Sequence, residues 1–400
     1  MSKVAIPKLG KFINVINGFA FKSGQFLEYK KENSLPVIKI KNVANGDVNL
    51  KDVHFYSYTN SLAKFVIKKG DTLIALTGNH PEIESQVVGL VSKYKLDEKA
   101  LLNQRVAKIV SKDEKELNNE FLYYFLKDKK THQYLASQST GSANQANISK
   151  TDIENIDFEK PLIGLQNFIA ETLTSFDNKI DLLQRQNQTL EALAETVFKQ
   201  KFIEEENTWD EKPLDTIAEF LNGLACQKYP IKKGEIGLPV IKIKELKAGI
   251  SDASDVATND VPTKYLINDG DMLFSWSGSL DVAIWFGGKG VLNQHLFKVS
   301  STLYPQWFYY YWVKFYLPIF KGIANDKATT MGHIQRHHLA DVSVTVPDAK
   351  TMKELDAIFN PFMQKIKSNS QQINTLTTLR DTLLPKLMSG EVTIKNTANA

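Results

Sequence analysis

An internal repeat restricts the folds open to this 400-residue chain more than any other feature. The residues LPVIKIK occur at 35–41 and again at 238–244. Other matched segments follow in the same order: INGFA (16–20) with LNGLA (221–225), LLNQRVAKI (101–109) with VLNQHLFKV (291–299), and FLYYFLK (121–127) with FYYYWVK (308–314). Toward the end of each half the offset between equivalent residues settles at 186. We therefore expect one scaffold, present twice, that carries two different sets of loops.

Each half begins with an α/β pattern. Apolar residues alternate with lysines up to residue 41, which predicts a half-buried strand. The solvated face of that strand and its repeat would carry Lys39, Lys41, Lys242 and Lys244. Residues 72–76 predict a buried strand, and residues 118–130 predict a short helix with an aromatic face. On these helices we expect four side chains in the core rather than as base-stacking platforms: Tyr123, Tyr124, Tyr309 and Tyr310.

After each globule, apolar residues recur in alternating steps of four and three, which is typical of a coiled-coil seam. The first seam contains Ile169, Leu173, Phe176, Ile180, Leu183, Leu190, Ala194 and Val197, with Asn187 in the missing place. The second contains Leu355, Phe359, Phe362, Ile366, Ile373, Leu376 and Leu383, with Asn369 and Arg380 as polar exceptions.

The order globule, helix, globule, helix predicts that the two long helices pair antiparallel. A buried amide needs a partner, so we expect Asn187 beside Asn369; the alternative is that each points to solvent. From Leu173 to Val197 the seam would span about 36 Å. That length is close to the roughly 34–36 Å between successive major-groove faces of B-DNA.

The expected fold class is thus mixed α/β: two globular domains separated by an antiparallel two-helix coiled coil, related by a pseudo-two-fold internal repeat. The expected domain bounds are 1–162 and 204–348 for the globules, and 163–203 and 349–400 for the helices. The only cysteine, Cys226, excludes an internal disulfide, and no apolar leader opens the chain, so we expect a cytoplasmic protein. The net charge of +4 allows a polyanionic partner without requiring one, and no segment predicts a membrane span.

Motifs of catalysis are missing from the sequence. The segment NPF (360–362) lacks a proline of the D/N-P-P-Y/F turn used by adenine methyltransferases, and FGGKG (286–290) lacks the frame of a cofactor-binding loop. His333 and His337 are four residues apart but have no HExxH context, so we expect neither a catalytic site nor a metal site.

Four further segments carry a family resemblance when taken together with the repeat: NGFAFKS (17–23), STGSANQANIS (139–149), TTMGHIQRHHL (329–339) and LRDTLLPKLMSGEV (379–392). The chain resembles the specificity subunits of type I restriction-modification enzymes over essentially its whole length. The resemblance implies that each globule is a target-recognition domain for one half of a bipartite, asymmetric site in double-stranded DNA. It implies that the helices set the spacing and dock two methyltransferase subunits. S-adenosylmethionine and ATP would bind only to the methyltransferase and motor-nuclease subunits.

Two other functions stay open: an autonomous DNA-acting enzyme, and a coiled-coil adaptor that binds protein. For DNA reading we favour polar side chains in loops that flank the matched segments. The candidates in the first copy are Lys22, Ser23, Thr77, Asn79, Arg105, Ser142, Asn144 and Gln145. Those in the second are Gln227, Lys228, Ser277, Ser279, His295, His333, Gln335 and Arg336. The pairs Asn103-Gln104 and Asn293-Gln294 are identical in both copies, which favours a structural or phosphate-binding role.

Overall fold

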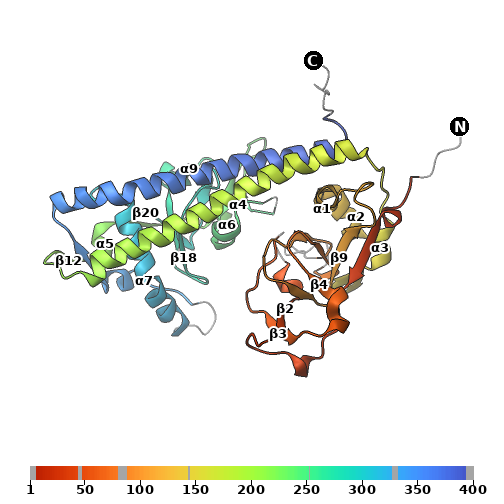
Figure 1. Ribbon diagram of the computed structural model, residues 1–400. Coiled ribbons are helices and arrows are strands. Elements are labelled where there is room, and N and C mark those ends of the chain that lie inside the picture. The colour runs from red at the N-terminus through yellow and green to blue at the C-terminus, as the bar shows by residue number, and fades with distance from the viewer. Residues whose placement is uncertain are drawn as a thin grey trace, which may run out of the picture. The chain divides into compact units, whose positions relative to one another are not determined.

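The computed structural model describes residues 6–43, 47–79, 88–142, 145–251, 253–326 and 332–392 (Figure 1). The chain divides into two compact units. Unit 1 contains Met1–Asp177 with Thr378–Ala400, and unit 2 contains Asn178–Thr377. Two long helices, α4 (Ile163–Lys199) and α9 (Ala349–Met388), contribute to both units. None of the helices in the described ranges combines the length and the hydropathy of a membrane-spanning segment.

Unit 1 is built on three small sheets. The first is antiparallel, in the order β1 (Ile13–Asn17), β9 (Val106–Ser111), β5 (Thr72–Ala75), β7 (Val91–Lys93). The second has the order β3 (His54–Ser57), β2 (Ser34–Ile38), β8 (Ala100–Leu102), β4 (Val66–Ile67), with β2 and β8 parallel. The third joins β10 (Thr140–Ser142), β11 (Gln145–Asn147) and β6 (Thr77–Gly78). Short helices complete the unit: α1 (Asn119–Lys127), α2 (Lys129–Ser137) and α3 (Lys150–Glu154).

Unit 2 repeats this plan. Its antiparallel sheet has the order β13 (Glu219–Asn222), β20 (Leu296–Ser300), β17 (Met272–Ser275), β18 (Asp281–Ile284). Its mixed sheet has the order β15 (Val256–Ala257), β14 (Leu238–Ile241), β19 (Gly290–Leu292), β16 (Leu266–Ile267), and β14 pairs parallel with β19 as β2 does with β8. The remaining elements are β12 (Asp210–Pro213) paired with β21 (Ser343–Val346), α5 (Leu214–Ile217), α6 (Ile243–Ala248), α7 (Gln306–Asp326) and α8 (His337–Ala340). The sequence repeat is therefore a repeat of topology.

A glycine in each copy explains why the INGFA and LNGLA segments match. A Cβ on Gly18 would lie 2.1 Å from the carbonyl oxygen of Asn103, and one on Gly223 would lie 2.2 Å from that of Asn293. Only glycine lets the chain after β1 or β13 come this close to the turn before β9 or β20.

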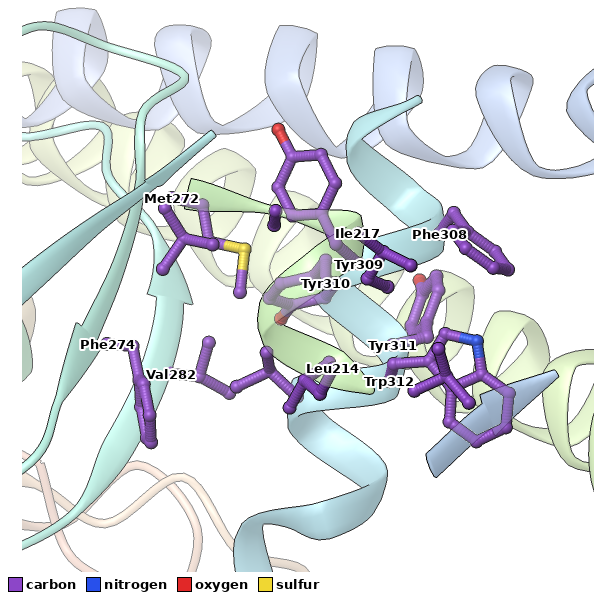
Figure 2. Close-up of a cluster of buried hydrophobic side chains, with 14 of the residues drawn as sticks. Leu214, Ile217, Met272, Phe274, Val282, Phe308, Tyr309, Tyr310, Tyr311 and Trp312 are labelled. Carbon is purple, nitrogen blue, oxygen red and sulfur yellow. The ribbon is translucent and has the colours of Figure 1, made fainter. Parts of the chain in front are cut away.

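The core of unit 2 is formed largely by aromatic side chains of α7. Figure 2 shows Tyr310, Tyr311 and Trp312 among apolar side chains of α5, β17 and β18. Tyr309 and Tyr310 are at most 5% exposed, as are Tyr123 and Tyr124 of α1 in unit 1. The prediction that these tyrosines are core residues is confirmed.

In unit 2 the long helices lie side by side and run antiparallel (Figure 1). Asn369 Nδ2 donates to Asn187 Oδ1 at 2.9 Å, and the rings of Phe198 and Phe359 are 6.4 Å apart. As residue numbers rise along α4 they therefore fall along α9. The predicted neighbourhood of the two asparagines is confirmed, as is the mixed α/β class with repeated units and a paired long helix.

In unit 1 the two long helices are joined by an ion pair that involves Arg380, one of the polar exceptions in the second seam. Arg380 Nη1 lies 2.7 Å from Asp177 Oδ1, and Tyr124 donates to the other carboxylate oxygen at 2.7 Å. Burial alone would raise the pKa of Asp177. The nearby Lys127 charge and the hydrogen bonds from Arg380 and Tyr124 outweigh burial, so that pKa is lowered.

The expected strand through the LPVIKIK segment is wrong in its last residues. β2 ends at Ile38 and β14 ends at Ile241, and a helical turn follows in each copy. The backbone N–H of Lys39 donates to Asn42 Oδ1, and that of Lys242 donates to Glu245 Oε2. A side chain three residues ahead thus caps the turn and overrides the alternating pattern.

Candidate nucleic-acid interface

Both units bring three chain segments together at one equivalent place. In unit 1 the backbone N–H of Leu76 donates to the Arg105 carbonyl, and that of Ile148 donates to Leu76, both at 2.9 Å. In unit 2 the backbone N–H of Trp276 donates to the His295 carbonyl at 3.4 Å, and that of Ile334 donates to the Trp276 carbonyl at 2.9 Å. We call the residues at this junction the strand-end cluster: Leu76, Thr77, Arg105 and Asn147 in unit 1, and Trp276, Ser277, His295 and His333 in unit 2.

In unit 2 the strand-end cluster centres on a partly exposed indole. The Trp276 ring lies 6.1 Å from that of His295 and 6.3 Å from that of His333. Its Nε1 donates to Asn222 Oδ1 at 3.1 Å and to the Gln294 carbonyl at 3.2 Å. These bonds fix the indole beside two imidazoles. His295 Nε2 also lies 3.5 Å from Gln294 Nε2, and imidazole nitrogens are groups that can donate to or accept from a base edge.

A buried hydroxyl holds one side chain of each cluster. Ser277 is 3% exposed, and its Oγ lies 2.9 Å from His295 Nδ1. Thr77 is 7% exposed, and its Oγ1 donates to Asn147 Oδ1 at 2.8 Å. Since these hydroxyls are buried, their geometry suits positioning of a neighbour rather than direct contact with a base.

The unit 1 cluster exposes a different chemistry at the same junction. Arg105 and Asn147 are both exposed. Guanidinium groups make two hydrogen bonds to guanine, and carboxamides make two to adenine. The two units therefore share a backbone frame and differ in the side chains that the frame presents.

The other sequence candidates lie outside the strand-end clusters. Lys22 and Ser23 are exposed at the turn η2 (Ser23–Gln25), and Gln227 and Lys228 are exposed at η7 (Cys226–Lys228). Asn79 follows β6 and is partly buried, and Ser279 Oγ contacts Lys247 Nζ. Ser142 and Gln145 belong to β10 and β11, whereas Asn144 lies outside the described residues.

Gln335 and Arg336 are exposed ahead of α8. Arg336 Nη2 donates to the Phe220 carbonyl at 2.7 Å, at the border of a cavity of about 350 Å³. Asp215 and Glu219 also line that cavity. Two carboxylates near the guanidinium make this a poorer place for a phosphate than the sequence suggested.

The asparagines of the repeated Asn-Gln pairs serve the scaffold, whereas Gln104 is exposed and Gln294 is half-buried. Asn103 is 8% exposed and Asn293 is 2% exposed, so neither amide faces a ligand. The oxygen of Asn103 accepts from the backbone of Arg105 at 3.5 Å, and that of Asn293 accepts from His295 at 3.2 Å. Of the two roles left open by the sequence, burial favours the structural one.

Sequence reasoning missed Asn147, Trp276, Asn222 and Lys247 as members or neighbours of the candidate surface. Asn147 could have been found, because it lies 186 residues before the selected His333. Trp276 could also have been found, because the aligned residue Leu76 differs within an otherwise matched segment.

Lysines at the end of β2 add positive charge to unit 1. Burial lowers the pKa of Lys39, and the neighbouring Lys41 lowers it further. Lys39 Nζ also lies 4.1 Å from the centre of the Phe26 ring. In unit 2 the equivalent Lys242 instead pairs with Asp255. Because a carboxylate neutralises Lys242, Lys39 is better suited to phosphate than this counterpart.

Among the residues with described positions, no three His, Cys, Asp or Glu side chains gather to hold a metal ion.

The family model for the type I restriction modification DNA specificity domain matches residues 1–192 and 206–378. The MjaIX specificity subunit of a Methanocaldococcus jannaschii type I restriction enzyme is 25% identical over 398 residues and 90% of each chain.

Two more relatives extend this similarity. The EcoKI specificity subunit of Escherichia coli is 23% identical over 75% of this chain and 66% of its own. The crystal structure of a type I restriction-modification S subunit from M. genitalium shares the fold, with a TM-score of 0.57 at 16% identity over 95% of this chain and 94% of that one. The chain belongs to the family of type I restriction-modification DNA specificity subunits.

Proposed function

We propose that unit 1 and unit 2 each read one half of a bipartite, asymmetric site in double-stranded DNA. The observation that carries this proposal is the shared backbone frame of the strand-end clusters, which presents Arg105 and Asn147 in one unit and His295 and His333 in the other. One frame gives both units the same approach to a groove. Different side chains on it give each half-site its own sequence.

Within each cluster the roles differ. Arg105, Asn147, His295 and His333 contact base edges, and Trp276 packs against both imidazoles. Thr77 and Ser277 position their neighbours. The remaining exposed candidates contact the phosphate backbone, which positions the protein without reading sequence.

Modified-base sequencing tests this assignment, with the full chain expressed beside its cognate methyltransferase subunits. Arg105→Ala should relax one half of the methylated site, and His295→Ala should relax only the other, each at a cost of about 1–3 kcal/mol per lost base contact. Arg185→Ala is the matched control, since Arg185 is exposed on α4. A single continuous palindrome, or both variants relaxing the same half, would contradict the two-reader proposal.

We also propose that the long helices dock two identical methyltransferase subunits. Leu193 on α4 is 48% exposed and Leu379 on α9 is 45% exposed, and these residues are equivalent in the repeat. Two equal apolar positions suit two copies of one partner. Leu193→Glu and Leu379→Glu should each remove one methyltransferase subunit from the purified complex, and the double variant should remove both.

Leu182 provides the control for this experiment, because it is 43% exposed while its repeat equivalent is Ser368. Leu182→Glu should leave the mass of the complex unchanged. If Leu193→Glu and Leu379→Glu behave in the same way, the partners dock elsewhere.

In this proposal the chain is non-catalytic and binds no cofactor. The methyltransferase subunits bind S-adenosylmethionine, a motor-nuclease subunit binds ATP, and the complex works in the cytoplasm. The helices would also set the gap between half-sites. One heptad inserted at the same layer of both helices adds about 10.5 Å, so the gap in the methylated site should widen by roughly three base pairs.

A further inference from the structure

The polar residues in the seam between α4 and α9 meet one another. In unit 2 the fully buried Asn369 donates to Asn187 Oδ1, and Asn187 Nδ2 donates to Ser370 Oγ at 3.1 Å. In unit 1 the side chains of Arg380 and Asp177 form an ion pair and are only 16% and 14% exposed. We call these two contacts the amide layer and the ionic layer.

The repeat places an apolar residue at every equivalent position. With the offset of 186, the equivalents of Asn187, Asn369, Asp177 and Arg380 are Ile373, Leu183, Met363 and Ala194. Leu183 and Ala194 are buried, and Met363 packs partly buried against the same core as Ala194. Each polar layer therefore has an apolar counterpart, which makes the seam asymmetric although the scaffold is repeated.

This asymmetry distinguishes correct pairing from self-pairing. If α4 paired in the same register with α4 of a second copy, Asp177 would face Ala194 and Asn187 would face Leu183. If α9 paired with α9, Arg380 would face Met363 and Asn369 would face Ile373. The α4 self-pair takes Arg380 away from Asp177, and the α9 self-pair leaves Arg380 with only Asp381 of its own helix. Each self-pair also buries an amide without its partner, so both are unfavourable.

We propose that the amide and ionic layers select the α4–α9 pair and exclude self-paired assemblies with a second copy of this chain. Such assemblies are a hazard of the repeat, because α4 and α9 carry the same seam pattern. The ionic layer is the stronger selector. In the part of the chain that the structure describes, Asn369 Oδ1 accepts no hydrogen bond, so the amide layer is incompletely satisfied.

The test makes the seam symmetric in the full-length chain. Its four substitutions are Asp177→Met, Arg380→Ala, Asn187→Ile and Asn369→Leu, each copying the repeat equivalent. Chains with two different affinity tags are mixed, unfolded in urea and refolded together. Tandem purification and light scattering then measure dimers that contain both tags. Each polar layer is expected to lower the equilibrium constant for self-pairing by about tenfold or more. Removing the layers should therefore raise the fraction of mixed dimers at least about tenfold over wild type.

The matched control keeps both charges of the ionic layer in place, Asp177→Glu with Arg380→Lys. It keeps the ion pair and so leaves self-pairing unfavourable, and it should refold to monomers as the wild type does. If the four-residue variant does not refold, Asp177→Met with Arg380→Ala gives the same comparison on the ionic layer alone. The proposal is overturned if symmetric variants form no more mixed dimers than wild type, or if the charge-conserving control forms as many as they do.

Discussion

Gly18 offers a sharp test of how the scaffold holds a strand-end cluster. In Gly18→Ala the new Cβ would lie 2.1 Å from the Asn103 oxygen and 2.3 Å from its carbonyl carbon. Relief requires a separation of about 1 Å between two backbone segments, because contacts below about 3.4 Å are repulsive. This separation would weaken two hydrogen bonds, from Phe19 N–H to the Leu102 carbonyl at 2.8 Å and from Gln104 N–H to the Phe19 carbonyl at 3.0 Å.

The expected cost follows from these contacts. Two weakened backbone bonds cost about 1 kcal/mol each, and residual overpacking adds about 1–2 kcal/mol. Gly18→Ala should thus lower the free energy of unfolding of unit 1 by about 3–4 kcal/mol. Gly223→Ala should do the same to unit 2, since its Cβ would lie 2.2 Å from the Asn293 oxygen.

Urea unfolding combined with hydrogen exchange measures both the size and the location of this effect. Faster exchange should appear in residues 101–106 for Gly18→Ala, and in residues 291–296 for Gly223→Ala. Gly24→Ala is the control, because a Cβ there meets nothing within 4 Å. If Gly18→Ala and Gly24→Ala unfold within about 0.5 kcal/mol of each other, the close approach does not constrain the scaffold.

Two other perturbations test the charges of unit 1. Asp177 has a lowered pKa, so its stabilisation is present above its unfolded pKa of about 3.9 and is lost as the pH falls through the lower folded value. Asp177→Asn should lower the free energy of unfolding by roughly 3 kcal/mol at pH 7. Below about pH 4 the free energy of unfolding of this variant should fall less with pH than that of the wild type. Equal acid sensitivity of the two proteins would contradict the ion pair. Lys39→Ala and Lys41→Ala should each reduce the slope of log affinity for duplex DNA against log salt by about 1. Lys242→Ala should leave that slope unchanged. If Lys242→Ala reduces the slope as much as Lys39→Ala does, the proposed difference between the units is wrong.

Much of the architecture could be predicted because it depends on periodicity and repetition. The heptad steps located both seams, and the two seam asparagines predicted the antiparallel register found in the contact from Asn369 to Asn187. The end of the strand through LPVIKIK was harder to predict. Asn42 caps the backbone N–H of Lys39, and Glu245 caps that of Lys242. These caps outweigh an alternating pattern of only four residues. The ion pair of Asp177 with Arg380 was also missed, since Asp177 gives no apolar or asparagine signal in the seam.

The candidate surface shows where the repeat can be used as an internal comparison. Asn103 and Asn293 are equal in both copies and prove to be buried scaffold, as their identity suggests. Asn147 and His333 differ at the same backbone position. Asn147 is exposed beside Thr77 of β6, and His333 is partly exposed beside the equivalent residue Ser277. Choosing candidates by loop position alone gave Ser142 and Asn144 and passed over Asn147. Which loop residue reaches the strand-end cluster depends on the pairing of β11 with β6, and that pairing is a tertiary contact.

A chain that reads two different half-sites with one repeated scaffold must keep two properties apart. The scaffold has to be equal in both copies, which explains the glycines after β1 and β13 and the buried asparagines that they approach. The reading side chains and the helix seam have to be unequal, because equal readers would select a palindrome and an equal seam would pair with itself. In the two proposals above, Asp177 with Arg380 and Arg105 against His295 are therefore two solutions to the same problem, one proposed to act on assembly and the other on DNA sequence. The repeat is most informative at the positions where its copies disagree.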